Sequence, residues 1–552
     1  MLRKISFFIL FMFFLTTSNA QVVYTHVSNA NIYEFLDELA SIKVIEINSV
    51  VKPYSRIFIA QKLKEANAKG DQLNKRQKDE LAFYLRDYNK EISVSPKTDY
   101  IGKELFCKMC RTEIKQLPEK KRLDLFHYKD SLFSFTINPI LGIKYYTNSN
   151  GNLYHSWSGA DAFAYLGKHF GLYSSLRDNH ESKIITTPDY LTQETGFGKK
   201  ESDKTGTDYS EMRGGITWSN EYMSIGVIKD HFVWGDNYNG SNIFSGKSPS
   251  FAQINWNVHP AKWFEFNYVH GWLASGVIDS QKTYYTPNGN RIVYREKLLS
   301  ANMFTFIPWK QFHISIGNSI IYSDMGSNPA YYIPVFFYKS LDHTYVTSNF
   351  GGSNAQMFCN ISSRNIKGVH LYTSWYVDEI HIANMWDKNK QSNFISAKAG
   401  FRISKIKNIS LIAEYTRSNP MVYKHFIPTT TFASNDYNLG HYLRDNAQEQ
   451  FFCIRYKPIR GLSIDLSYVN AQKGEDYEYT GVGGSGLGLP FLDSLAWKNE
   501  TYDVKVQYEF INDGIIFAEF TNSFINGDIG KYTPEFMWGR KNTFTFGLNF
   551  GF

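Results

Sequence analysis

The chain has 552 residues, including 43 Phe, 38 Tyr and 11 Trp, an aromatic content that is unusual for a soluble enzyme. The formal net charge of +7 is not accompanied by a concentrated basic segment, so the composition excludes nucleic acid as an expected partner. Four cysteines in so long a chain exclude a small disulfide-stabilised scaffold. Beyond the first residues, no run of 18 apolar residues predicts a transmembrane helix.

The first 20 residues have the layout of an export signal. Arg3 and Lys4 precede an apolar run from Ile5 to Leu15, and small polar residues follow as far as Ala20. The apolar run is too short to span a bilayer, and this order of segments is typical of a cleaved signal peptide. We therefore expect residues 1–20 to be removed after export, an uncleaved anchor being the alternative.

Residues 21–132 are expected to form a periplasmic α-helical region followed by a linker. Apolar residues recur every three or four positions over 32–42, which predicts an amphipathic helix. Ser55 is suited to cap a second helix, and Asn74 followed by Gln77 has the spacing of a capping box for a third. Three short helices cannot each bury an apolar face alone, so they should pack together or against another part of the protein.

Residues 133–552 consist of segments with alternating apolar and polar residues, which predict β-strands, separated by two kinds of connection. Eight connections are tight turns: GKHF 167–170, SNEY 219–222, HPAK 259–262, PWKQ 308–311, RNIKG 364–368, SKIKN 404–408, KPIRG 457–461 and NDG 512–514. Longer polar stretches lie between them, and short turns at one rim with long loops at the other are typical of outer-membrane barrels. The pattern predicts a mainly β fold, an antiparallel transmembrane β-barrel of about 18 strands. Sixteen or twenty strands would follow if one turn were misread.

The last ten residues, TFTFGLNFGF, alternate without a break between large apolar and small or polar residues. We expect the even positions, Phe544 to Phe552, to contact outer-membrane lipid or lipopolysaccharide, and the odd positions to face the lumen. A terminal aromatic residue is also what the barrel-insertion machinery of outer membranes typically reads, so that machinery is an expected partner during assembly. A soluble propeller or pair of sandwiches is the rival fold, but we find no repeat of 40–50 residues.

No motif in the chain indicates catalysis. Neither a His-Glu-x-x-His motif nor a Gly-x-Ser-x-Gly motif occurs, and the glycine-rich segments 240–248 and 481–490 lack the spacing or context of a phosphate loop. Cys107 and Cys110, in CKMC, fit a redox pair, half of a metal site or a small disulfide, and an oxidising compartment favours the disulfide. We expect no metal, no cofactor and no enzymatic activity.

Three segments combine aromatic rings with amides and carboxylates: KDHFVWGDNYNGSN (229–242), WYVDEIHIANMW (375–386) and EYTRSNPMVYKHF (414–426). Rings offer apolar contact at a low entropy cost, and planar polar groups pair with hydroxyls, so the combination suits sugars. The alternatives are an interfacial aromatic girdle and lumen charges that pair with one another. The candidate polysaccharide-binding residues, expected on outward loops, are Trp234, Asp236, Asn237, Tyr238, Trp375, Asp378, Glu379, Glu414, Arg417, Tyr423 and His425.

Seven segments, in order along the chain, resemble the Wzi family of capsule-assembly outer-membrane proteins in its long-looped Bacteroidetes-type form. They are 32–66, GKHFGLYSSLRDN (167–179), 225–254, FNYVHGWLAS (266–275), WYVDEIHI (375–382), LIAEYTRSNPMVYKH (411–425) and LGHYLRDNAQEQ (439–450). The resemblance implies an 18-stranded barrel above a periplasmic helical bundle, no catalysis, and a lectin-like role in holding surface polysaccharide. Asp236-Asn237 and Gly246-Lys247 depart from the family pattern, so the sugar specificity of relatives is not carried over.

These observations predict a cell outer-membrane protein of capsule or exopolysaccharide assembly. Its long loops would face outward and bind capsular or other extracellular polysaccharide through many weak contacts that add up as avidity. A porin or oligosaccharide channel is the alternative, in which the aromatic residues would line a sliding path. An outer-membrane hydrolase is a third hypothesis, although no nucleophile and base can be paired.

Overall fold

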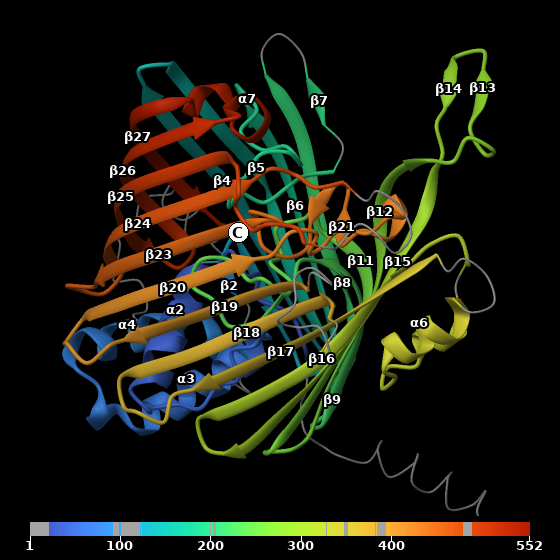
Figure 1. Cartoon of the computed structure of the whole chain (residues 1–552). Coiled ribbons are helices and arrows are strands. Elements are labelled where there is room, and N and C mark those ends of the chain that lie inside the picture. Colours follow the sequence, from blue (N-terminus) through green and yellow to red (C-terminus); the bar gives the residue numbers. More distant parts are fainter. Residues whose placement is uncertain are drawn as a thin grey trace, which may run out of the picture.

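The computed structural model describes residues 21–91, 99–100, 122, 124–198, 200–202, 206–326, 328–346, 352–380, 382, 393–478 and 488–551. Within these ranges, eighteen long antiparallel strands form one closed barrel (Figure 1), which confirms the predicted fold and strand number. The expected signal peptide, residues 1–20, and the pair Cys107 and Cys110 lie outside the described residues.

The long strands follow one another around the barrel in chain order. They are β4 (Phe133–Asn148), β5 (Gly151–Leu166), β6 (Phe170–Glu181), β8 (Thr207–Ser219), β9 (Met223–Asp230), β11 (Phe251–Ala261), β12 (Phe264–Ile278), β15 (Tyr294–Trp309), β16 (Phe312–Tyr322), β17 (Ser353–Ser363), β18 (Val369–Glu379), β19 (Phe394–Ile403), β20 (Ile409–Ser418), β23 (Ala447–Tyr456), β24 (Leu462–Gly474), β25 (Leu495–Ile511), β26 (Gly514–Gly527) and β27 (Gly539–Phe550). Cys359 in β17 and Cys453 in β23 are free thiols within strands.

The barrel closes between its last and first long strands. β27 pairs with β4 from Phe544↔Thr147 to Phe550↔Leu141. The remaining part of the same edge of β4 pairs with the short strand β3 (Phe126–Lys129), which in turn pairs with β2 (Asp99–Tyr100). No edge of β27 or β4 along this pairing is therefore left for another chain to add to.

All eight predicted tight turns join neighbouring long strands at one rim of the barrel. The connections at the opposite rim are longer, and they carry the small elements β7 (Glu201–Ser202), β10 (Val233–Trp234), β13 (Tyr284–Thr286), β14 (Gly289–Arg291), β21 (Ala433–Ser434), β22 (Tyr437–Asn438), α6 (Tyr338–Val346) and α7 (Ile529–Tyr532). The first connection at that rim, between β4 and β5, differs because it is a two-residue turn at 149–150. The asymmetry between the rims is the one that the turn signals predict.

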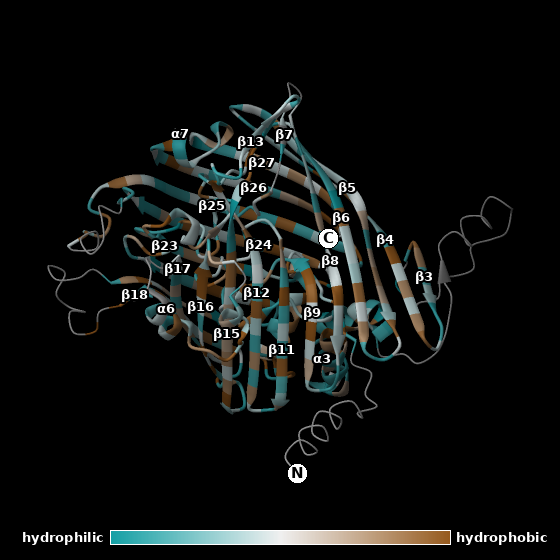
Figure 2. Cartoon of the chain, turned by 90° about the vertical axis from the view of Figure 1, so that its right-hand side faces the viewer, coloured by the Kyte–Doolittle hydropathy of each residue, from teal (hydrophilic) through white to brown (hydrophobic). Residues whose placement is uncertain are grey.

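The strands present apolar side chains outward, as the alternation along β27 shows. Phe544, Phe546 and Leu548 are exposed on the outer surface, whereas the alternating residues Thr543 and Thr545 are buried. Figure 2 shows brown and pale apolar stretches recurring along β4, β5, β6 and β8. A barrel that exposes such a surface is stable only where lipid covers it, so the fold is that of an outer-membrane barrel.

The N-terminal region forms the three expected helices, α2 (Ala30–Ser41), α3 (Arg56–Ala68) and α4 (Lys75–Tyr88). The Ser55 side chain accepts a hydrogen bond from the backbone N–H of Phe58 and caps α3. Asn74 and Gln77 form the predicted capping box of α4. The helices share one apolar core that includes Phe35, Leu39, Ile59, Leu63, Leu81 and Tyr84. Among the described residues, no helix is long and apolar enough to cross a membrane.

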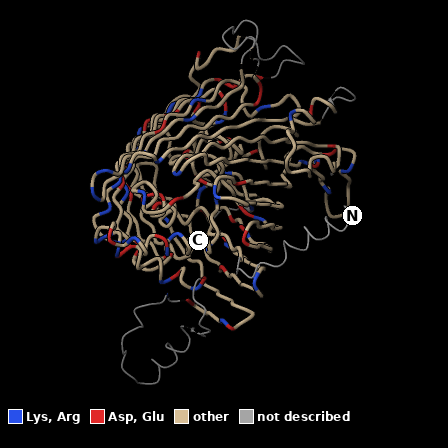
Figure 3. The backbone as a smooth tube through the Cα atoms, turned by 90° about the horizontal axis from the view of Figure 1, so that it is seen from below, with Lys and Arg blue, Asp and Glu red and all other residues tan. Residues whose placement is uncertain are grey.

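These helices lie within the barrel at the rim of the tight turns (Figure 1). Asp37 of α2 pairs with Arg364 beside one tight turn and with Arg402 beside another, at 2.5 and 2.9 Å. Glu34 pairs with Arg402 and Arg455, each at 2.6 Å. Figure 3, from below, shows acidic and basic positions interleaved over this end of the molecule. The helical region is therefore held to the barrel wall by complementary charges.

Candidate functional site in the barrel lumen

The connection 231–250, between β9 and β11, folds into the lumen. Its strand β10 pairs with β1 (Val51–Lys52) of the N-terminal region. Trp234 in β10 is 1% exposed, and its ring lies edge-on to Phe244 and Phe358 with centroids 5.4 and 5.9 Å away. The expected outward position of Trp234 is therefore wrong, because an inward loop buries the ring in an apolar core. Its part in sugar binding stays a prediction.

Asp236 is also buried, and its carboxylate is used by the protein itself. It accepts hydrogen bonds from the Ser49 hydroxyl and from Asn360 Nδ2, the latter at 2.8 Å. Burial alone would raise the pKa of Asp236, but the neighbouring His370 and Arg364 hold it below its ordinary value. Asn237 turns its amide back to the carbonyl of Gly235, 2.8 Å away. Asp236 thus joins the inward loop to the N-terminal region and to β17.

Tyr238 and Glu414 extend this network toward the helices. The Tyr238 hydroxyl donates to Asp37 Oδ2 at 2.7 Å. Glu414 accepts hydrogen bonds from the backbone N–H groups of Tyr238 and Asn239, and its Oε2 lies 2.8 Å from Lys398 Nζ. The side chains of Lys398 and Glu414 are fully buried. A carboxylate with this many internal partners fixes the loop rather than leaving acceptors for a ligand.

The connection 419–446, between β20 and β23, packs against the first loop. The Tyr423 hydroxyl donates to the carbonyl of Asn242 at 2.6 Å, and the Tyr423 backbone N–H donates to Asp378 Oδ2 at 3.2 Å. Tyr423 is buried, with its ring 4.6 Å from that of Tyr376. His425, further along the loop, lies with its Nδ1 2.6 Å from the Thr430 hydroxyl. Tyr423 and Asp378 are thus also inside the lumen.

Three of the candidate residues lie away from this packed group. Trp375 is 45% exposed on the outward face of β18, where Leu371 is exposed as well. Arg417 is exposed on β20 and lies 3.8 Å from the ring centroid of Phe491. Glu379 is exposed at the end of β18. Trp375 therefore occupies the lipid-facing position expected of a girdle residue, the alternative that the sequence left open.

The opposite side of the lumen is hollow. A cavity of about 590 Å³ lies between the wall formed by β4, β5, β6, β8 and β25–β27, the residues 28–31 that lead into α2, and the inward loop 186–198. The aromatic residues Trp157, Phe197, Tyr209 and Phe517 line it, and the rings of Phe197 and Tyr209 stack with centroids 4.0 Å apart. This volume lies within the range of about 300–1,000 Å³ that is usual for small-ligand sites.

Polar groups from several strands converge on the same cavity. Glu181 accepts a hydrogen bond from the Tyr209 hydroxyl at 2.9 Å, and Asn179 Oδ1 lies 3.1 Å from His155 Nε2. In contrast, Trp157 Nε1, Arg177 Nε and Asn549 Oδ1 are buried atoms without a hydrogen-bond partner among the described residues. These three atoms have almost no accessible surface, so the group that a ligand in the cavity can reach is the half-buried Arg177 guanidinium beyond Nε.

Sequence reasoning missed the cavity residues, although a signal for some of them is visible. Arg177, Asn179 and Glu181 occupy alternate positions of β6 and therefore share one face of the strand. Charged and amide side chains that alternate with outward residues indicate a polar lumen wall. The partners of this face, on β5, β8 and the loop 186–198, are distant in sequence and depend on the closed barrel.

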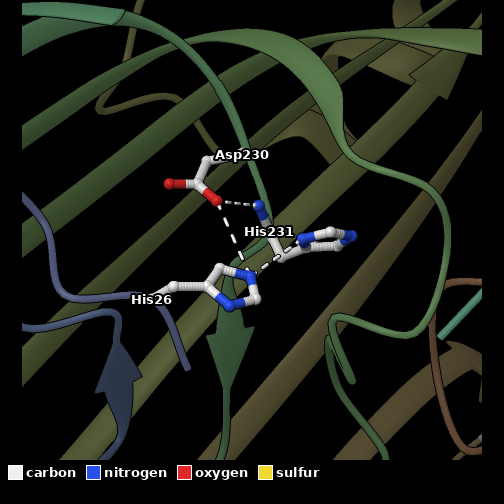
Figure 4. A group of neighbouring side chains, drawn as sticks. All are labelled: His26, Asp230 and His231. Atoms are coloured by element: carbon white, nitrogen blue, oxygen red, sulfur yellow. Dashed lines mark hydrogen bonds and ion pairs between the residues drawn. The ribbon is translucent and has the colours of Figure 1, made fainter. Parts of the chain in front are cut away.

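His26, Asp230 and His231 form a cluster beside the cavity (Figure 4). His26 Nε2 lies 3.0 Å from His231 Nδ1 and 3.8 Å from Asp230 Oδ1. The three residues offer potential metal-ligand atoms within 4.8 Å of one another. Asp230 is already engaged, because the Tyr173 hydroxyl donates to it at 2.9 Å and Arg213 lies 3.6 Å away. The cluster joins the N-terminal segment to the end of β9.

Neither a protein-family model nor a curated protein matches this chain. Among solved structures, Wzi of Escherichia coli, a carbohydrate-binding β-barrel of the outer membrane involved in group 1 capsule assembly, matches over 97% of this chain and 100% of its own, with a TM-score of 0.55 and 9% identity. The chain has the Wzi fold. OpdK of Pseudomonas aeruginosa, solved with vanillate, matches over 75% of this chain and 98% of its own, with a TM-score of 0.42 and 7% identity. OccD3 of the same organism matches over 75% and 90%, with a TM-score of 0.41 and 11% identity.

Proposed function

We propose that this protein binds a polysaccharide at the outer surface of the outer membrane and takes part in capsule or exopolysaccharide assembly without catalysing a reaction. The observation that carries the proposal is the Wzi fold, matched over nearly the whole chain. Wzi is described as a carbohydrate-binding barrel of capsule assembly, and the proposal extends that role to this chain. The rim of long loops would face outward and the helices would lie on the periplasmic side.

The contents of the lumen support attachment rather than passage. The helices α2–α4 occupy the tight-turn end, and the loops 231–250 and 419–446 pack into one side of the lumen. These elements are joined to the wall by buried ion pairs, including Lys398–Glu414 and Arg364–Asp37. A porin needs a continuous open path, and this network leaves only the opposite side of the lumen, where the cavity lies, for one.

The best-placed surface for a polymer is the hairpin β13–β14, which projects from the long-loop rim (Figure 1). Tyr285 is 84% exposed, and Tyr284 and Tyr294 are each 57% exposed. Exposed tyrosine rings offer the flat apolar surface that packs on a sugar ring, with a hydroxyl at the edge. Several weak contacts of this kind to a repeating polymer would add up to useful avidity.

The experiment that tests this proposal measures binding of the detergent-solubilised protein to the surface polysaccharide of its own host. The parent would be compared with a variant carrying Tyr284→Ser, Tyr285→Ser and Tyr294→Ser. The matched control carries Tyr222→Ser and Trp263→Ser, which remove exposed rings at the opposite rim. We expect the hairpin variant to bind roughly tenfold more weakly or worse and the control to bind like the parent.

Absence of polysaccharide binding by the parent, together with steady conductance in a planar bilayer, would overturn the proposal in favour of a channel. Heat-modifiable migration would establish that each variant is folded before its binding is measured. Release of shortened polysaccharide during the assay would instead favour a hydrolase.

A further inference from the structure

The cavity beside β4–β9 contains an arginine without a directly bonded counter-ion among the described residues. Arg177 projects into it from β6, with its guanidinium 5.3 Å from the ring centroid of Trp157. Among the described residues, Arg177 Nε has no hydrogen-bond partner, and no carboxylate lies within 4.0 Å of the guanidinium. A guanidinium in this state, partly removed from water and unpaired, favours an anionic ligand.

The carboxylates that line the cavity contact groups other than Arg177. Glu181 accepts from the Tyr209 hydroxyl at 2.9 Å and from the backbone N–H of Ile185 at 3.3 Å. Glu211 Oε1 lies 3.4 Å from His231 Nε2, and Glu194 Oε1 lies 3.8 Å from Lys144 Nζ. Glu211 also attracts Arg177 and Lys229 through space, but no ion pair within 4.0 Å joins it to the Arg177 guanidinium, which therefore keeps room for an anionic ligand.

A second cation, Lys229, also lines the cavity. Its Nζ donates to the Met212 carbonyl at 2.7 Å and to the Ser250 hydroxyl at 2.6 Å, and neither of these acceptors is charged. The indole of Trp157 packs against Gly142 of β4, where an added Cβ would lie 2.5 Å from Nε1, so Trp157 contributes a ring rather than a donor. The site thus combines positive charge with the N–H groups of Arg177 and Lys229, the complement of a carboxylate and of sugar oxygens.

The walls of the cavity indicate the kind of molecule that bears this carboxylate. Trp157, Phe197 and Tyr209 present flat rings, and the ring face of a pyranose is apolar where its C–H bonds align. Gly196 leaves room for the ring of Tyr437, because a Cβ at Gly196 would lie 2.5 Å from that ring. The loop that carries Phe197 is thereby packed closely over the cavity.

We propose that this cavity binds an acidic sugar unit, a hexuronate, of the polysaccharide. Arg177 pairs with the carboxylate, and the aromatic rings pack on the sugar faces. This inference rests on the proposed function, since it names the sugar class that the protein recognises. The cavity would hold one short stretch of the polymer, while the exposed hairpin provides repeated weak contacts outside.

The test is titration calorimetry of the full-length protein in detergent with trigalacturonate and with its carboxyl-reduced counterpart, which has the same linkage and no charge. We expect the parent to bind the charged form at least about tenfold more tightly, as one well-placed ion pair predicts. Arg177→Gln should remove that preference. Phe197→Ala, which removes a ring from the cavity wall, should weaken binding of both forms by a few-fold.

The matched control is Arg540→Gln, which removes an exposed arginine from the outer surface of β27 and should bind like the parent. Equal affinity of Arg177→Gln and the parent, equal affinity of the parent for both trisaccharides, or no binding at millimolar ligand would each overturn the inference. If the parent then still bound the host polysaccharide, the proposed function would stand with its site elsewhere. If it bound neither, both proposals would fail.

Discussion

The two sides of the lumen are built from the same kinds of residue and differ in how closely those residues are packed. Beside β15–β20, Asp236 accepts from Ser49 of the N-terminal region and from Asn360 of β17, and Glu414 accepts from the inward loop and lies beside Lys398 of β19. Beside β4–β6, Arg177 lines a cavity, and its Nε has no hydrogen-bond partner among the described residues. Neither aromatic and charged residues nor unpaired polar atoms mark a ligand site by themselves, since Arg364 Nε and the Tyr376 hydroxyl are also unpaired on the packed side. The informative signal is a cavity lined by a cation without a directly bonded counter-ion.

The largest expected effect in the packed side comes from Trp234→Ala. Removing this ring leaves a cavity between Phe244 and Phe358, which should lower the free energy of unfolding by about 3–5 kcal/mol. Urea-dependent folding into detergent measures the loss. The folded fraction should bind polysaccharide like the parent. A loss of binding without a loss of stability would contradict the assignment of the packed side to structure and of the cavity side to binding.

Asp37→Asn should weaken docking of the helices by about 1.5–3 kcal/mol, because it removes the charge that faces Arg364 and Arg402. Burial would raise the pKa of Asp37, but these two arginines hold it well below its usual range. The stabilisation is therefore present above the unfolded pKa of about 3.9 and is lost only as the pH falls below it. Planar-bilayer conductance at neutral pH should be higher for the variant than for the parent.

A smaller effect is expected at the contact between the N-terminal segment and β9. Burial lowers the pKa of both His26 and His231, with a further contribution from nearby charges such as Arg213. Below about pH 6.5 the unfolded state takes up protons that the folded state excludes, so the contact should weaken as the pH falls through that value. Proteolysis of the N-terminal region should accelerate at pH 5 relative to pH 7.5.

A variant with His26→Gln and His231→Gln serves as the control for that measurement. Asp230, Glu211, Lys229 and Arg177 also face this cluster and remain unchanged. The variant should lose most of the pH dependence between pH 5 and 7.5. If the pH dependence of proteolysis were unchanged in this variant, groups other than His26 and His231 would cause it.

The smallest effect on stability is expected for Tyr285→Ser on the projecting hairpin. The side chain is almost fully exposed, so the free energy of unfolding should change by no more than about 0.5 kcal/mol. Polysaccharide binding should nevertheless fall. If this variant and the parent bound immobilised polysaccharide equally well, the binding site would be in the lumen rather than on the hairpin.

The barrel could be predicted from the sequence because its signals are local. Turns such as KPIRG 457–461 and the alternation along 543–552 each lie within one short segment, and the eight turns set the strand number. The capping residues Ser55 and Asn74 likewise act within three residues of themselves. The helices and strands followed from these local patterns.

The interior could not be predicted, because its contacts join distant segments. Nothing local to Trp234 indicates that β10 pairs with β1, and nothing local to Glu414 indicates that it accepts from the backbone of Asn239. An inward loop and an outward loop have similar compositions when both carry aromatic and polar residues. The expected outward exposure of Trp234, Asp236 and Glu414 is wrong, and their part in sugar binding stays a prediction.

The closure between β27 and β4 constrains the order of assembly. The two strands that form the seam lie at opposite ends of the spanning sequence, so the ring cannot shut before its last strand is in place. The helices that the ring encloses precede all of the spanning strands in the chain. The wall must therefore either wrap around helices that are already folded or admit them through the rim afterwards. The ion pairs between α2 and the wall lie at the rim of the tight turns. If the helices enter after the barrel has formed, these pairs are the contacts through which α2 would bind.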